Sequence, residues 1–134
     1  MRIITDVNIW ITYMFSPNFR AYCDRFFEDE FQLLVCNRFI QEFKQTIEYP
    51  ELRERLIKNG FSCEGLLQKI IAKGISVNVV SEVNVCRDVK DNYLLALAKD
   101  GNADYLITRD KDLLTLVTFG KTRIVTMYDF EMLS

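Results

Sequence analysis

The sequence contains no histidine among its 134 residues. This absence excludes a Ser-His-Asp or Cys-His mechanism and any metal site with imidazole ligands. Acid–base chemistry must then come from carboxylates, lysine, tyrosine, cysteine or metal-bound water. A metal site built from carboxylates alone selects hard cations such as Mg2+ or Mn2+.

Long apolar runs and linkers are missing as well. No apolar run approaches the roughly 18 residues that cross a bilayer, and the N-terminus lacks the basic start and the cleavage site of a signal peptide. The chain has no repeat, low-complexity tract or Pro/Gly/Ser linker, so we predict a single domain over residues 1–134. We expect a cytoplasmic protein with no membrane partner.

A strong net charge and paired cysteine motifs are also absent. The formal net charge of −2 predicts little non-specific affinity for a polyanion, so any nucleic-acid role must rest on a local basic patch and on bound metal. The four cysteines lack C-x-x-C spacing and are predicted to be buried, reduced thiols: Cys23, Cys36, Cys63 and Cys86.

Apolar patterning predicts short strands that alternate with helices. Strands are expected at 2–5, 32–36, 75–80 (continuing at 83–86), 104–108 and 123–126. Helices or helical turns are expected at 8–13, 17–30, 51–58, 63–73, 91–99, 109–116 and 128–133, with another between the predicted N-cap Asn37 and Pro50. This order predicts an α/β fold: a three-layer α/β/α sandwich around a mostly parallel sheet of four to five strands.

Acidic residues follow several of these predicted strands. Asp6 comes directly after the first strand and Asp110 after the strand at 104–108. Asp91 starts the apolar stripe of its helix, because Leu94 and Leu95 lie three and four residues further on. Glu42 borders the apolar stripe of the helix after the second strand. Ligands bind at the carboxyl ends of strands in such sheets, so we expect these four acids to meet there.

A cluster of carboxylates is costly without a cation. Two unit charges about 4 Å apart repel by about 4 kcal/mol at intermediate dielectric, and a divalent cation removes that repulsion. Carboxylate-held Mg2+ or Mn2+ suits the hydrolysis of a phosphodiester. Asp112 is a further candidate ligand, and Asn8 a candidate donor to a carboxylate or phosphate.

Four stretches resemble the PIN domain, in particular the ribonuclease toxins of bacterial toxin–antitoxin pairs. They occur in the family's order over nearly the whole chain: Thr5-Asp6-Val7-Asn8, Gln41-Glu42-Phe43, Asp88-Val89-Lys90-Asp91-Asn92 and the run from Ala103 to Leu113. The resemblance implies a metal-dependent endoribonuclease that acts on RNA, a small antitoxin protein as partner, and a homodimer or higher oligomer.

The resemblance also assigns residue roles. It implies metal-binding and catalytic roles for Asp6, Glu42, Asp91 and Asp110, and a water-positioning or supporting hydroxyl at Thr108. Two positions depart from the family pattern: Arg109 stands where many relatives have a small residue, and Val89 where proline is common. Neither removes a predicted ligand.

Basic side chains near the same edge are candidates for gripping phosphate: Arg38, Lys44, Arg109 and Lys111. Two other functions remain open at this point. One is a phospho-acceptor module of the receiver type, which also gathers acids, a threonine and a lysine at strand ends. The other is a protein of the same fold that binds RNA and metal without cutting.

Overall fold

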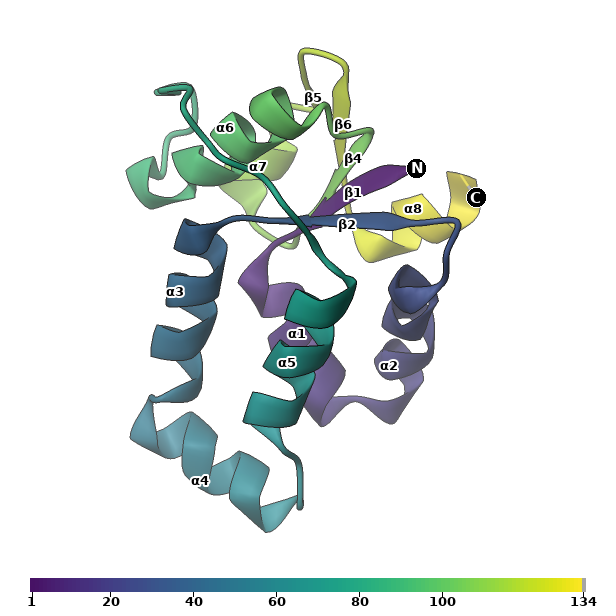
Figure 1. Ribbon diagram of the computed structural model, residues 1–134, viewed down its shortest axis with the longest axis vertical. Helices are drawn as coiled ribbons and strands as arrows, with labels where there is room; N and C mark the ends of the chain where they lie inside the picture. The colour runs from purple at the N-terminus through teal and green to yellow at the C-terminus, as the bar shows by residue number, and fades with distance from the viewer. Residues whose placement is uncertain (134) are drawn as a thin grey trace.

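A six-stranded sheet organises the computed structural model, which describes residues 1–133 (Figure 1). The strand order is β3-β2-β1-β4-β6-β5, and only the β5–β6 pair is antiparallel. The strands are β1 (Arg2–Thr5), β2 (Gln32–Val35), β3 (Ile75–Ser76), β4 (Tyr105–Ile107), β5 (Thr118–Phe119) and β6 (Thr122–Val125). The predicted α/β sandwich with a mostly parallel sheet is confirmed. The strand β6 corresponds to the one predicted at 123–126, and β5 is an additional strand.

Helices cover both faces of this sheet (Figure 1). One face carries α1 (Val7–Phe15), α2 (Pro17–Asp24), α3 (Asn37–Ile47) and α5 (Cys63–Lys73), and α4 (Pro50–Lys58) connects α3 and α5 at their ends away from the sheet (Figure 1). The other is covered by α6 (Asn92–Gly101), while α7 (Lys111–Leu114) and α8 (Met127–Leu133) flank β6. Short 3-10 turns lie at η1 (Arg25–Phe27) and η2 (Val89–Asp91). None of the helices within residues 1–133 is both long and apolar enough to cross a membrane.

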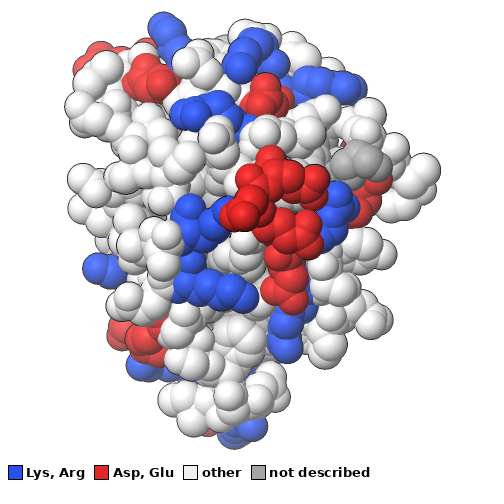
Figure 2. Space-filling model, turned by 45° about the vertical axis from the view of Figure 1, so that its right-hand side comes forward, with Lys and Arg blue, Asp and Glu red and all other residues white. Residues whose placement is uncertain are grey.

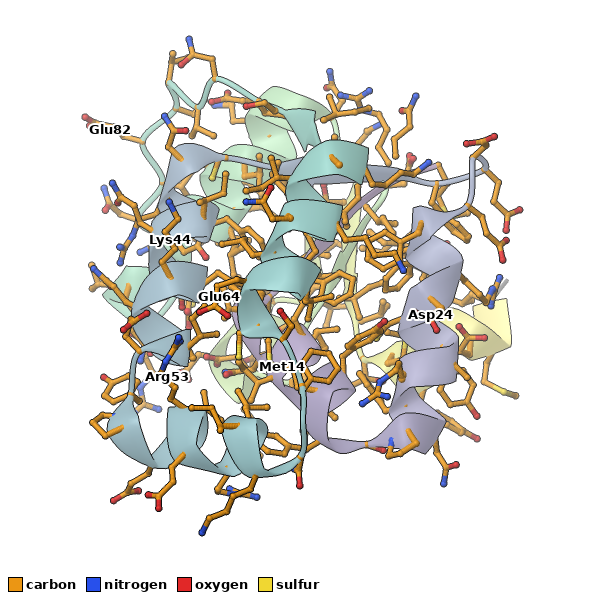
Figure 3. The ribbon with its side chains drawn as sticks, turned by 60° about the horizontal axis from the view of Figure 1, so that its bottom comes forward. Met14, Asp24, Lys44, Arg53, Glu64 and Glu82 are labelled. Carbon is orange, nitrogen blue, oxygen red and sulfur yellow. The ribbon has the colours of Figure 1, made fainter. Side chains whose placement is uncertain are left out.

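The central strands β1, β2 and β4 are mostly buried. Ile3 and Ile4 of the central strand β1 have no exposed surface, as expected for a parallel sheet between two helical layers. Aromatic side chains fill the space between β1 and the helices. Phe26 packs edge-to-face against Phe31 and Phe130, with 5.8 Å between ring centroids in each pair. Away from the core, Arg53 of α4 pairs with Glu64 of α5 at 2.7 Å (Figure 3).

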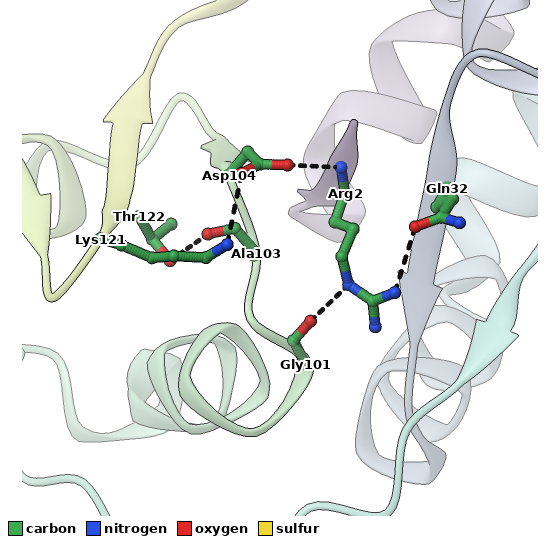
Figure 4. Close-up of polar contacts among 7 residues, drawn as sticks. All are labelled: Arg2, Gln32, Gly101, Ala103, Asp104, Lys121 and Thr122. Atoms are coloured by element: carbon green, nitrogen blue, oxygen red, sulfur yellow. Dashed lines mark hydrogen bonds and ion pairs between the residues drawn. The ribbon is translucent and has the colours of Figure 1, made fainter.

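A polar network at the amino edge of the sheet sets the register of the central strands (Figure 4). The backbone N–H of Arg2 donates to Asp104 Oδ2 at 2.8 Å, and Arg2 Nε donates to the carbonyl of Gly101 at 2.7 Å. Lys121 Nζ lies 3.4 Å from Asp104 Oδ1. With β1 and β4 held level at this end, Thr5 pairs with Ile107 at the other.

The predicted strand at 75–80 is wrong beyond Ser76, and the extension at 83–86 does not form. Asp100 is the reason: its Oδ2 accepts from the backbone N–H groups of Val80 and Ser81 at 2.7 and 2.9 Å. These two backbone donors therefore bond to a carboxylate instead of to a neighbouring strand.

Several predicted boundaries also shift. Asn37 is the first residue of α3 and Cys36 its N-cap, so the predicted capping role of Asn37 is wrong. The helix predicted at 91–99 continues to Gly101, and Asn102, at φ 52°, provides the left-handed residue that ends it. Gly101 allows close packing, because a Cβ there would lie 2.8 Å from Leu34 Cδ1. The first two helices differ as well: α1 continues to Phe15, and the predicted helix at 17–30 ends at Asp24.

Candidate metal centre

Two neighbouring strands deliver the first polar side chains of the site. Asp6 follows β1 and Thr108 follows β4, one residue beyond the paired residues Thr5 and Ile107. The hydroxyl of Thr108 donates to Asp6 Oδ2 at 2.7 Å and accepts from the backbone N–H of Asp110 at 3.0 Å. Thr108 is completely buried. Its hydroxyl therefore ties the carboxylate of Asp6 to the start of the loop that carries Asp110.

Three carboxylates meet beside this pair. Asp88, Asp91 and Asp110 each offer one oxygen, and these oxygens all lie within 4.8 Å of one another. Local backbone structure aims each of them: Asp88 caps η2, Asp91 ends η2 at the start of α6, and Asp110 caps α7. The three oxygens are close enough to bind one cation together.

Asp91 is the most buried member of this cluster, with 5% of its surface exposed. Its Oδ2 has no hydrogen-bond partner among residues 1–133. Burial raises the pKa of Asp91 to about 8, and the neighbouring carboxylates of Asp110 and Asp88 add to the rise. The neighbouring carboxyl of Asp91 holds the pKa of Asp110 below its usual value. Burial and mutual repulsion therefore make this group of carboxylates a favourable place for a positive charge.

The residues of the cluster fit a divalent cation. Every donor is a hard carboxylate oxygen, and the set contains no nitrogen or sulfur ligand. The one cation paired with the cluster among the described residues is Lys90, whose Nζ lies 3.7 Å from Asp88 Oδ2 and is mostly exposed. One exposed lysine does not neutralise three carboxylates, and the unpartnered oxygen of Asp91 needs a proton or a cation.

Asp6 lies next to the cluster and interacts with it electrostatically. The side chain is 6% exposed, and its Oδ1 accepts from the backbone N–H of Asn8 at 2.8 Å. Burial raises the pKa of Asp6, while the bonds from Asn8 and Thr108 oppose this rise and the charge of Asp110 adds to it. Asp6 is therefore held in place by fixed donors at the border of the three-acid cluster.

Glu42 is hydrogen-bonded to a tyrosine of α6. The phenol of Tyr93, on α6, donates to Glu42 Oε2 on α3. Burial raises the pKa of Tyr93, and the carboxylates of Glu42 and Asp6 raise it further. Glu42 is not a member of the compact three-acid group. Its bond to Tyr93 links it to the side of the site where Asp6 lies.

The remaining predicted site residues lie outside the three-acid cluster. Asp112 donates its backbone N–H to Asp110 Oδ1 at 2.8 Å, and Asn8 contributes its backbone N–H to Asp6. Arg109 Nη1 donates to Thr12 Oγ1 at 2.8 Å. The guanidinium of Arg38 lies 5.6 Å from the centroid of the Tyr93 ring.

The lysines predicted near this edge, Lys44 on α3 (Figure 3) and Lys111 on α7, are exposed and form no ion pair within residues 1–133. Figure 2 shows another face of the molecule, where an acidic group is bordered by basic side chains and both signs of charge are interspersed. That face is not a continuous basic surface.

Asp88 is the cluster member that sequence reasoning missed. An aspartate just before a helix is usually a cap, and Asp88 does accept from the backbone N–H of Lys90 at 3.3 Å. Capping leaves a carboxylate with further lone pairs, and its spacing of three residues from Asp91 was the available signal. The path of the segment before η2 brings Asp88 to Asp110, which no local pattern indicates.

Together, the parallel sheet and the acids beyond its carboxyl edge define an α/β protein with a candidate carboxylate metal centre. The family model of the PIN domain matches residues 2–112. The chain belongs to the PIN domain family, whose members are generally nucleases. All the acids discussed above lie within the matched residues.

A search for relatives adds one match. The chain is 29% identical over 122 residues to an uncharacterized protein of Methanocaldococcus jannaschii, and the alignment covers 87% of this chain and 75% of that protein. No solved structure matches the chain.

Proposed function

We propose that this protein is a metal-dependent endoribonuclease that hydrolyses RNA phosphodiesters. The observation that carries the proposal is the buried Oδ2 of Asp91, which lacks a hydrogen-bond partner among the described residues and faces two other carboxylates. Keeping such a group costs stability unless a cation binds it. The nuclease fold of the family supports the reaction class.

In this proposal, Asp88, Asp91 and Asp110 hold Mg2+ or Mn2+, and Asp6 and Glu42 complete the catalytic set. Asp112 stays a further candidate ligand. An ion at this place, when bound, supplies positive charge for a phosphodiester and acidifies water for attack on phosphorus. The chain's own contribution is to hold carboxylates in fixed positions before the substrate arrives.

Thr108 and Tyr93 act as positioning residues in this arrangement. The Thr108 hydroxyl fixes one oxygen of Asp6 and leaves the other to the N–H of Asn8. The Tyr93 phenol donates a hydrogen bond to Glu42 Oε2 and so fixes the position of that carboxylate. Because its pKa is raised, the phenol keeps its proton at neutral pH and remains a donor.

The test compares two substitutions that remove the same charge. Asp91→Asn is expected to abolish metal-dependent cleavage of single-stranded RNA, because it removes a ligand from the middle of the cluster. Asp129→Asn, on exposed α8, is expected to cleave like the wild type. Cleavage by Asp91→Asn at the wild-type rate would refute the proposal. Metal-dependent RNA binding without cleavage by the wild type would favour a non-cleaving member of the family instead.

We propose further that the protein is the toxin of a toxin–antitoxin pair and acts in the cytoplasm as a homodimer or higher oligomer. The resemblance to ribonuclease toxins supports the role, and four unpaired thiols fit a reducing compartment. Expression of the chain should arrest growth, whereas Asp91→Asn should not. A small DNA-binding protein encoded beside it should restore growth, and light scattering of the purified chain measures the oligomer.

A further inference from the structure

A cavity of about 550 Å³ opens next to the proposed catalytic site, between the start of α3, β3 with the segment after it, and Tyr93 of α6. Its wall contains one cation, one aromatic ring and several polar groups. Those used below are Arg38, Tyr93, Asn37, Gln41, Ser76 and Asn78. No residue of the three-acid cluster lines it.

Tyr93 joins this cavity to the catalytic site. Arg38 and Glu42 lie four residues apart on α3 and so share a face of that helix. Tyr93 contacts both: Arg38 lies 5.6 Å from its ring centroid, and its phenol donates to Glu42. A ligand in the cavity would therefore contact Tyr93, whose phenol bonds to Glu42 of the proposed catalytic set.

The polar groups in the wall suit a nucleobase. Asn37, Gln41 and Asn78 each carry an amide with both donors and an acceptor, and Ser76 adds a hydroxyl. Asn37 and Gln41 are exposed, and Asn37 does not cap its helix. Amides of this kind read the edges of unpaired bases, and planar guanidinium or aromatic groups stack on their faces.

The charge of the cavity suits a phosphate ester. Arg38 is the only Lys or Arg in its wall, and no acidic residue lines it. Within residues 1–133 Arg38 forms no ion pair, so its charge is available to a ligand. A guanidinium matches phosphate through two parallel hydrogen bonds.

The far wall is held in place by a carboxylate outside the cavity. Asp100 accepts from Val80 N, Ser81 N and Ser81 Oγ, which anchors the segment directly after Asn78. At the other end of this segment, Val77 N donates to the carbonyl of Val35 at 2.8 Å. This wall of the cavity is therefore anchored at both of its ends, which favours binding without rearrangement.

We propose that this cavity binds one unpaired nucleotide of the RNA next to the phosphodiester that is cut. The proposal rests on the ribonuclease function above and adds a binding site for one base beside the cut. In a duplex, the edges and faces of the bases are already engaged, and entry would require a base to leave the stack. Base preference at one position beside the cut would then be set by Asn37, Gln41 and Asn78.

Binding is tested directly by NMR of the side-chain amides in the 15.8 kDa chain. Each nucleoside 5′-monophosphate is titrated in EDTA, with inorganic phosphate as a second probe. We expect at least one nucleotide to shift the amide signals of Asn37, Gln41 and Asn78, and phosphate alone to leave them in place. If no nucleotide shifts these signals, the cavity is not a nucleotide site and the inference is wrong.

Variants identify the contacts. Arg38→Ala and Gln41→Ala should each weaken the binding of the preferred nucleotide roughly tenfold, the equivalent of one lost hydrogen bond or stacking contact. Arg38→Lys should recover part of the loss, because it keeps the charge without the planar group. Asn18→Ala, an exposed amide on α2, is the matched control and should bind like the wild type. Equal affinity in all variants would refute the assignment.

Cleavage mapping separates this inference from the proposed function. If RNA is cut and Asn78→Ala changes the base preference beside the cut, both hold. If RNA is cut with an unchanged preference and duplex RNA is cut as well as single strands, the nucleotide site fails and the nuclease stands. If nothing is cut while nucleotides still shift the amides, the ribonuclease proposal fails and the binding site stands.

Discussion

Replacing Asp91 by Asn is expected to stabilise the metal-free protein while removing its response to metal. In the folded chain the pKa of Asp91 rises from 3.8 to about 8, because the carboxyl is buried among other acids. The folded state therefore binds the proton more tightly than the unfolded state. For an acid of this kind, folding stability falls as the pH rises between these two pKa values.

The size of the effect follows from this shift. Each pKa unit corresponds to about 1.36 kcal/mol. Raising the pH from the unfolded pKa of Asp91 to about 7 therefore lowers the free energy of unfolding by ~4 kcal/mol. The lowered pKa of the partner Asp110 offsets part of it. We therefore expect Asp91→Asn to gain ~2 kcal/mol in EDTA at about pH 7.5, and little at about pH 4. For a chain of this size, a gain of ~2 kcal/mol corresponds to a Tm higher by roughly 8 °C.

The assay is thermal unfolding in EDTA and in excess Mg2+ or Mn2+ at both pH values. The wild type should gain ~2.7 kcal/mol when the metal is at about 100 times its Kd, and Asp91→Asn should gain almost nothing. Asp129→Asn removes the same charge at an exposed position and should follow the wild type throughout. If Asp91→Asn is less stable than the wild type in EDTA near neutral pH, or responds to metal as the wild type does, the reasoning is wrong.

Three further predictions concern single positions. Thr108→Val leaves an oxygen of Asp6 without its donor and should lower metal affinity about 10- to 100-fold, measured by calorimetry, with Thr108→Ser recovering most of the loss. Asp88→Asn should weaken metal binding at least tenfold in the same titration. Unchanged metal affinity would mean that Asp88 only caps η2. Gly101→Ala should lower the free energy of unfolding by about 1–3 kcal/mol in urea, because its Cβ would meet Leu34 Cδ1 at 2.8 Å; an unchanged midpoint would contradict the packing argument.

Much of the site could be anticipated because parallel strands share one carboxyl edge. Asp6 and Thr108 follow directly on two strands, and their register brings them to within 2.7 Å although they lie 102 residues apart in the chain. Asp91 was recognisable because an acid at the head of an apolar helix stripe must face the interior. These inferences need only periodicity and the direction of the strands.

Other features were not readable from local patterns. Asp88 looks like a cap and is one, so its place in the cluster depends on where the whole segment before η2 runs. The strand predicted at 75–80 has the right composition, yet Asp100 takes the backbone donors near its end. Glu42 was expected among the metal ligands, but it lies outside the three-acid cluster. It bonds instead to Tyr93, which is 51 residues further along the chain.

By itself, then, the sequence determined the layers of the fold, the strand ends that carry acids and the absence of histidine chemistry. These follow from the burial of apolar surface and from residue chemistry, which act along short stretches of chain. Only the tertiary structure decided which carboxylates face one another, how burial raises the pKa of Asp91, and that a polar cavity opens beside Tyr93. Those features arise from contacts between distant segments, whose geometry is set by packing and by hydrogen bonds that no local pattern encodes.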